Sequence, residues 1–253
     1  MPTKSQLVFT ARSQVLVRDR KRRSVWKVVE KRMRLPAGRT ALLLCDVWDK
    51  HTQRGAEERL GAMVPRMNRV VNACRKKGVL IIHSPSDTID FYAEHPARKH
   101  VLDTKKRKPR ERRHDDPPLP FPKESTATDT PTIDTWKESA GYPWTREHKG
   151  ITLRDEDAIS ADGVEVYSLM KAEGVEHLLI MGVHTNCCIL HRTFAIKQMT
   201  RWGVDVYLVR DLTDGIYDPA KPPYVSHDEG TALVVGYIEK FWCPTLASHD
   251  LLQ

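Results

Sequence analysis

The chain has 253 residues, a length that suits one large domain with a full hydrophobic core, or one domain with an appendage. It contains no run of about 18 apolar residues, so neither a membrane-spanning helix nor a membrane partner is expected. The formal net charge is +8, but the basic excess is concentrated in residues 18–34 and 105–114, and the rest of the chain is net acidic. Because the positive charge is confined to two segments, no nucleic-acid partner is expected for the main body.

The five cysteines are irregularly spaced: Cys45, Cys74, Cys187, Cys188 and Cys243. Their number is odd, and no two have the C-x-x-C spacing of metal ligands. Neither a disulfide framework nor a structural zinc site is therefore indicated. Reduced thiols, together with a start that lacks an apolar signal region, predict a cytoplasmic protein.

Residues 1–36 are expected to form a β-hairpin extension. Apolar and polar residues alternate over residues 7–17, and apolar residues return over residues 25–29, after a charged turn at residues 19–23. A hairpin alone is only marginally stable, so this one must pack against the main domain or against a second copy. The apolar surface that it leaves unattached leads us to expect a homo-oligomer.

Residues 37–253 are expected to form one α/β domain, because short apolar strands alternate with amphipathic helices. Predicted strands cover residues 41–45, 79–82, 151–153, 177–181, 204–209 and, as a short edge strand, 243–246, and predicted helices cover residues 60–74, 88–102, 162–173, 188–201 and 226–241. This alternation gives a doubly wound, mostly parallel sheet with helices on both faces. In the commonest strand order, 3-2-1-4-5-6, the first and fourth strands are neighbours, and ligands bind at their carboxyl ends.

An insertion at about residues 104–149 interrupts the alternation. It contains the second basic run, many prolines and almost no apolar periodicity. A connection of this length is typical of a functional lid or a loosely ordered insertion. We expect an extended arm on the surface, anchored by its aromatic residues Trp136, Tyr142 and Trp144.

A cysteine and an aspartate are predicted to face each other across the crevice between the first and fourth strands. Asp46 ends the first strand, and Cys187 and Cys188 follow the fourth. A cysteine in the first turn of a helix faces unpaired N–H groups and the positive end of the helix dipole, which lower the pKa of its thiol. A partly desolvated carboxylate has a raised pKa, which suits a general base. Each residue also fits a structural role, Asp46 as a turn cap and the cysteines as small buried residues.

From about Thr40 to Thr245 the chain resembles the isochorismatase-like cysteine hydrolases, which include nicotinamidases and carbamoyl-amine hydrolases. The motifs that carry the resemblance are LCD at residues 44–46, GVHTNCC at residues 182–188 and RD at residues 210–211. In the family pattern the catalytic cysteine stands three residues after a threonine. This spacing selects Cys188, three residues after Thr185, over Cys187.

The resemblance implies a cysteine-dependent hydrolase that acts on non-peptide C–N bonds without a cofactor. Cys188 would attack a carbonyl carbon to form a thioester acyl-enzyme, with Asp46 relaying protons. The family also implies a cis peptide bond between Val183 and His184. The backbone N–H groups of His184 and Cys188 would form the oxyanion hole. The expected substrate is a small amide, ureido or carbamoyl compound.

Two positions depart from the family pattern near the predicted site. The family has a lysine at the end of the third strand, where this chain offers only Lys149 before residues 151–153 or Arg154 after them. Trp48 stands where a glutamine is common. Trp48 and His51 are candidates for binding the substrate.

No metal is expected. Nicotinamidases bind one through an aspartate and two histidines after the second strand, and that spacing is not reproduced by Asp87, Asp90, His95 and His100. Two other functions stay open. The first is a non-catalytic scaffold or binding protein with the same fold, which the missing lysine favours. The second is vinyl-ether hydrolysis of the isochorismate type, against which Cys188 counts, because family members with that activity work without the cysteine.

Overall fold

The computed structural model describes residues 5–121, 128–130 and 141–253. Its strands are β1 (Gln6–Arg18), β2 (Ser24–Pro36), β3 (Thr40–Cys45), β4 (Leu80–Ser84), β5 (Ala158–Ile159), β6 (His177–Val183), β7 (Asp205–Asp214) and β8 (Thr245–Leu246). Its α-helices are α1 (Arg54–Lys76), α2 (Pro96–Leu102), α3 (Gly163–Ala172), α4 (Cys188–His191), α5 (Ile196–Arg201) and α6 (His227–Phe241). Short 3-10 helices are η1 (Ala37–Arg39), η2 (Ile89–Tyr92) and η4 (Ser248–Leu252).

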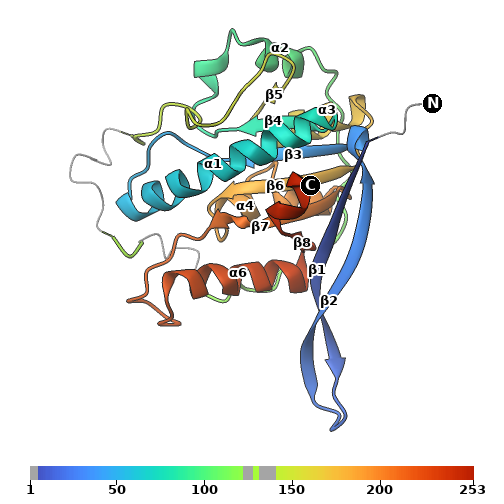
Figure 1. The fold of residues 1–253 in the computed structure, drawn as a ribbon, viewed down its shortest axis with the longest axis vertical. Helices are drawn as coiled ribbons and strands as arrows, with labels where there is room; N and C mark the ends of the chain where they lie inside the picture. Colours follow the sequence, from blue (N-terminus) through green and yellow to red (C-terminus); the bar gives the residue numbers. More distant parts are fainter. Residues whose placement is uncertain (1–4, 122–127, 131–140) are drawn as a thin grey trace.

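The strands form one sheet in the order β2-β1-β8-β7-β6-β3-β4-β5. From β5 to β8 the neighbouring strands are parallel, and β3 lies between β4 and β6. This is the predicted doubly wound order, which is therefore confirmed. Every residue of β3 is buried, as expected for a central strand that is covered on both faces. Figure 1 shows helices on both sides of the sheet.

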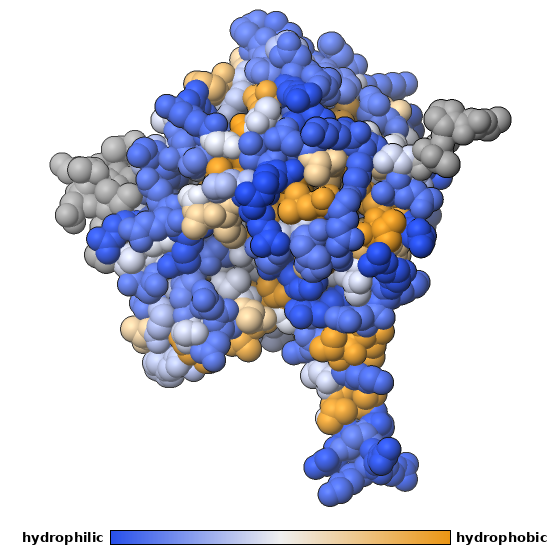
Figure 2. Space-filling view, in the orientation of Figure 1, coloured by the Kyte–Doolittle hydropathy of each residue, from blue (hydrophilic) through white to orange (hydrophobic). Residues whose placement is uncertain are grey.

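The N-terminal hairpin is confirmed, and it also extends the sheet. β1 and β2 pair antiparallel along their whole length. Arg12 of β1 pairs with Thr245, so β8 lies inside the sheet and not at its edge, contrary to our expectation. The outer half of the hairpin projects from the domain (Figure 1) and carries exposed apolar side chains, which Figure 2 shows above its charged tip.

Two hydrophobic layers enclose the sheet. The predicted apolar stripe of α1 packs on one face through residues such as Leu60, Val64 and Met67. Residues of α3, α5 and α6 pack on the other face. The capping box predicted at the start of α6 is present, with Ser226 and Glu229 each bonding the other's backbone N–H. None of the described helices is long and apolar enough to cross a membrane.

The third strand lies seven residues later than predicted, at Ala158–Ile159. Residues 151–153 do not join the sheet, and Ile151 packs in the same cluster as the apolar stripe of α1. The Thr152 N–H donates to the side chain of Asn68, and its carbonyl accepts a hydrogen bond from Arg75. Because side chains of α1 satisfy this backbone, the segment has no need of a strand partner.

The single helix predicted for residues 188–201 is broken into α4 and α5. Arg192, at the end of α4, is extended, with ψ 150. The break is where the start of α3 approaches, since a Cβ on Gly163 would lie 2.1 Å from the carbonyl oxygen of Thr193. The Gly163 N–H also donates to the Thr193 hydroxyl. The packing of α3 against this segment accounts for the interruption.

Aromatic stacking attaches the end of the insertion to the domain. Trp144 stacks on Trp48, with ring centroids 4.2 Å apart, and Tyr142 stacks on Trp144 at the same separation. Trp136, the third predicted anchor, lies outside the described residues. The stacking brings the insertion directly over the segment that follows β3.

A buried charged network joins β4 to the segments around β5. The ring nitrogens of His83 lie 2.7 Å from a Glu147 oxygen and 3.2 Å from an Asp157 oxygen. Arg75 also pairs with Asp157. Burial opposes a charge on His83, but the two carboxylates outweigh it and raise the pKa of His83 to about 9. His83 is therefore charged at neutral pH.

Replacement of His83 by leucine is expected to lower the free energy of unfolding by about 3–5 kcal/mol, because it leaves buried carboxylates without their partner. The pKa rises from 6.5 to about 9 on folding. The stabilisation of about 3 kcal/mol that this shift represents is therefore fully present below pH 6.5 and is lost as the pH rises through 9. Urea unfolding at pH 6, 8 and 10 measures both effects. His249→Leu, at an exposed site, is the control, and equal stability of the two variants would contradict the prediction.

Candidate active site

The carboxyl ends of β3 and β6 meet at the candidate site. Cys45 pairs with Gly182, whose φ is +125, and a Cβ at position 182 would lie 2.0 Å from the Cys45 carbonyl oxygen. Only glycine lets the two strand ends approach this closely. The segments that continue to Asp46 and to Cys188 therefore leave the sheet side by side.

Asp46 is fully buried and has a left-handed backbone conformation, with φ 52. Its Oδ1 accepts a hydrogen bond of 2.8 Å from the Ser86 N–H, and its Oδ2 accepts one of 3.0 Å from Arg192 Nε. Burial raises the pKa of Asp46, while Arg192 and a hydrogen bond from the Cys188 thiol oppose the rise. The carboxylate thus interacts with both a thiol and a guanidinium.

Cys188 is buried at the start of α4, directly beside Asp46. The lowered thiol pKa expected from the sequence is wrong. A hydrogen bond with Cys187, burial and the negative charge of Asp46 raise the pKa of Cys188 well above its ordinary value. Because α4 has only four residues, its dipole is too small to offset these effects. A thiol with a raised pKa needs a nearby base to become a nucleophile.

The positive charge at the site comes from Arg192, which the sequence reasoning missed. Burial disfavours its charge, but Asp46 and Cys188 outweigh burial and raise its pKa further, so the guanidinium stays charged. Its Nη2 also lies 3.2 Å from Asp87. The available signal was its spacing, because residues four apart in a helical turn lie on one face, and Arg192 is four residues after Cys188.

Neither residue proposed as a substitute for the family's lysine supplies this charge. Arg154 is half exposed and pairs with Glu156. Lys149 is exposed. Ser160 follows the true third strand, and its hydroxyl donates to Glu165.

Trp48 and His51, the predicted substrate-binding residues, lie close together beside the site. Trp48 donates its indole N–H to the Ser86 carbonyl at 3.0 Å, and its ring is part of the stack with Trp144. His51 Nε2 lies 2.9 Å from His184 Nε2. Trp48 is therefore held on both its edge and its face, next to a histidine pair.

Burial keeps both histidines neutral, because it lowers the pKa of His51 to about 3 and that of His184 to about 4. His51 Nδ1 accepts from the Gln53 N–H, which assigns the proton of His51 to Nε2 and makes it the donor to His184 Nε2. The proton of His184 is then on Nδ1, a buried atom without a hydrogen-bond partner among the described residues. This N–H is available to a ligand.

The turn between β6 and α4 presents further donors. The peptide bond between Val183 and His184 is cis. The Thr185 N–H donates to the Asp214 carbonyl, and the Cys187 N–H donates to that of His184. Among the turn and loop hydrogen bonds of the described residues, none uses the N–H of His184 or Cys188 as its donor. The turn thus carries two backbone N–H groups that these hydrogen bonds do not use.

The acidic and histidine side chains after β4 serve other contacts. Asp87 pairs with Arg192, and His95 caps α2 by accepting from the Ala97 N–H. His100 lies against Glu173 on the surface. Within the described ranges, no three His, Cys, Asp or Glu side chains are grouped so that they could bind a metal ion.

The chain is similar to known proteins in both sequence and fold. Residues 40–221 match the isochorismatase domain family. A cysteine hydrolase from Pseudomonas syringae pv. phaseolicola 1448A has a similar structure, with a TM-score of 0.52 and 15% identity over 85% of this chain and 92% of that one. For an isochorismatase from Pseudomonas putida KT2440 the TM-score is 0.53 and the identity 11%, over 85% of this chain and 90% of that one.

At these identities the structural neighbours establish the fold alone. No curated protein sequence matches the chain. The family match, by contrast, spans well over half of the sequence and includes Asp46, Cys188 and Arg192. The chain therefore belongs to the isochorismatase family.

Proposed function

We propose that the protein is a cysteine hydrolase that cleaves a C–N bond of a small amide, ureido or carbamoyl substrate. The observation that carries this proposal is the buried contact of the Cys188 thiol with the Asp46 carboxylate. That carboxylate also forms an ion pair with Arg192. A nucleophile, a base for its proton and a fixed positive charge are the parts that acyl transfer through cysteine requires.

In the first half of the reaction, Asp46 removes the thiol proton while the Cys188 sulfur attacks the substrate's carbonyl carbon. The oxyanion that forms accepts hydrogen bonds from the N–H groups of His184 and Cys188. As the C–N bond breaks, Asp46 returns its proton to the leaving nitrogen. The products are a free amine or ammonia and a thioester on Cys188.

In the second half, a water molecule attacks the thioester carbon and Asp46 takes one of its protons. The C–S bond breaks, the acid leaves, and Asp46 protonates the Cys188 sulfur. Arg192 keeps its charge throughout, because its pKa is raised further by Asp46 and Cys188. Its role in this scheme is to hold Asp46 ionised in a buried site, and it transfers no proton.

Trp48 and the histidine pair are proposed to position the substrate. The aromatic stack with Trp144 offers a flat wall for a planar amide or ureido group. The partnerless Nδ1–H of His184 would donate to a substrate oxygen. These contacts favour a small, planar, neutral substrate.

Arg192 weakens the case for the alternative function, a non-catalytic scaffold or binding protein. That alternative depended on the missing lysine, and a guanidinium 3.0 Å from Asp46 supplies a positive charge without it. The enzyme proposal is therefore the better supported of the two.

An activity screen over small amides, ureides and N-carbamoyl amines tests the proposed function. Release of ammonia or amine is the readout, and Cys188→Ala is the control. We expect at least one class to be hydrolysed by the wild-type protein and not by this variant. Hydrolysis that persists in Cys188→Ala, or its absence from every class, would refute the proposal.

A further inference from the structure

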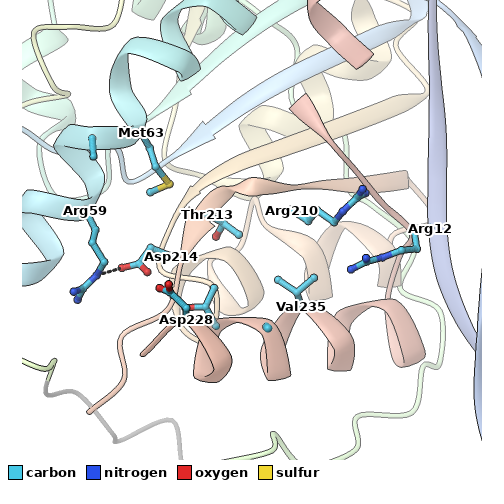
Figure 3. Close-up of a pocket in the computed structure, with 11 residues that line it drawn as sticks. Arg12, Arg59, Met63, Arg210, Thr213, Asp214, Asp228 and Val235 are labelled. Carbon is cyan, nitrogen blue, oxygen red and sulfur yellow. Dashed lines mark hydrogen bonds and ion pairs between the residues drawn. The ribbon is translucent and has the colours of Figure 1, made fainter. Parts of the chain in front are cut away.

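A cavity of about 420 Å³, which Cys188 does not line, opens beside β7 (Figure 3). It exists because β8 is short and pairs with β7 only at Leu208 and Val209. Residues 210–214 therefore have no neighbouring strand on that side, and the space between α1 and α6, which cover opposite faces of the sheet, is left open. Its volume lies in the range of small-molecule sites, about 300–1,000 Å³.

One end of the cavity carries two arginines, Arg12 and Arg210, as Figure 3 shows. Arg210 forms no ion pair with any described residue, and its Nη1 is buried without a hydrogen-bond partner. Burial and the like charge of Arg12 lower the pKa of Arg210. Arg210 is therefore a half-buried guanidinium whose one buried donor has no hydrogen-bond partner among the described residues.

The carboxylates of Asp211, Glu239 and Glu30 oppose this lowering of the pKa, but none of them forms an ion pair with Arg210, and the first two are bonded elsewhere. Glu239 accepts from Arg12, Gln14 and Thr245. Asp211 accepts from the backbone and side chain of Ser248, and it pairs with Arg66. The guanidinium of Arg210 is thus available to pair with an anionic ligand.

The opposite end of the cavity differs in charge. Arg59 pairs there with Asp214, which also accepts from His227, and Asp228 lies next to them (Figure 3). The two carboxylates outnumber the one guanidinium at this end, so it attracts a negative group less than the end with Arg12 and Arg210 does. The walls between the ends include Met63 of α1 and Val235 of α6, which suit a carbon skeleton.

We propose that this cavity binds a small organic monocarboxylate. Its carboxylate pairs with Arg210 and Arg12, and its carbon chain lies between Met63 and Val235. The planar fork of a guanidinium matches a carboxylate with two parallel hydrogen bonds, which explains why arginine stands here. The site is additional to the proposed catalytic one, because neither Cys188 nor Asp46 lines it.

A residue that lines the cavity contacts the turn between β6 and α4, residues 184–187. The hydroxyl of Thr213, which lines it, is 2.8 Å from the hydroxyl of Thr185. Thr185 follows His184 in the chain. A bound carboxylate would therefore lie behind the turn that presents the backbone donors.

Isothermal titration calorimetry of the full chain with hexanoate tests the site. We expect saturable binding of hexanoate to one site, and binding of hexan-1-ol, the neutral analogue, at least tenfold weaker. Arg210→Met should weaken hexanoate binding tenfold or more. Arg69→Met, which removes the same charge from an exposed position of α1 outside the cavity, should leave the affinity unchanged.

Two further variants test the cavity without relying on Arg210→Met. Ala232→Trp fills the mouth of the cavity from an exposed position of α6 and should abolish binding even if Arg210→Met fails to fold. Cys188→Ala should bind hexanoate like the wild type, which separates this site from the catalytic one. The proposal is overturned if hexanoate does not bind saturably, if hexan-1-ol binds as tightly, if Arg210→Met and Ala232→Trp both keep wild-type affinity, or if Cys188→Ala loses it.

Discussion

Replacement of Cys188 by alanine is expected to lower kcat/KM about 10³-fold or more, whereas Cys187→Ala should keep most of the activity. The two thiols are adjacent in sequence, but only that of Cys188 donates a hydrogen bond to Asp46 among the interactions that shift the pKa of that carboxyl. Removal of a nucleophile eliminates the covalent route, and what then remains is the contribution of binding and of the oxyanion donors. Steady-state rates of both variants on one hydrolysed substrate measure the difference.

Detection of the acyl-enzyme tests independently which of the two cysteines is the nucleophile. Acid quenching during turnover should trap a thioester, and mass spectrometry should locate it on Cys188. Cys187→Ala should still accumulate the adduct, and Cys188→Ala should not. An adduct on Cys187, or equal activity of the two variants, would contradict the assignment of the nucleophile.

Arg192→Met is expected to lower kcat/KM about 10²–10⁴-fold, because it removes the charge that keeps Asp46 ionised. Burial already raises the pKa of Asp46, and Arg192 is the largest opposing influence. Activity requires the ionised carboxylate, so it is lost as the pH falls through the pKa of Asp46. In Arg192→Met that pKa rises further, and the acid limb of the pH–rate profile should move to higher pH.

Arg192→Lys should recover part of the activity, because it restores a positive charge but not the planar fork that contacts both Asp46 and Asp87. Arg154→Met is the matched control. It removes a half-exposed arginine at a position that the sequence offered for the family's lysine, and it should leave the profile unchanged. A large effect of Arg154→Met, or an Arg192→Met profile with an unshifted acid limb, would contradict the role given to Arg192.

The strand order was predictable because the central strands carry unambiguous apolar runs. β3 and β6 are long and wholly or almost wholly buried, so their residue types alone identify them. β5 has two residues, too few to show any period, and residues 151–153, with Ile151 and Leu153, match a strand pattern better. Their true partners are side chains of α1, a tertiary contact that no local pattern reports.

The contact of Cys188 with Asp46 could be predicted from the sequence because both residues follow central strands, whose order fixes which ends meet. Arg192 could not be found in this way. Its position depends on the break after α4, and no glycine or proline marks that break in residues 189–195. The cause lies in the approach of Gly163, 29 residues earlier in the chain. The pKa of Cys188 was missed for a related reason, since a helix expected to be long has only four residues.

The close approach of Gly182 to the Cys45 carbonyl fixes the relative position of Asp46 and Cys188 independently of the segments proposed to bind the substrate. The pairing of β3 with β6 sets the relative position of Asp46 and Cys188, and the surrounding loops do not. Trp48, His51 and Trp144 stand on segments outside the sheet, where changes leave that contact untouched. For the proposed hydrolase, substrate preference can therefore be changed through these segments while the relative position of Asp46 and Cys188 is kept.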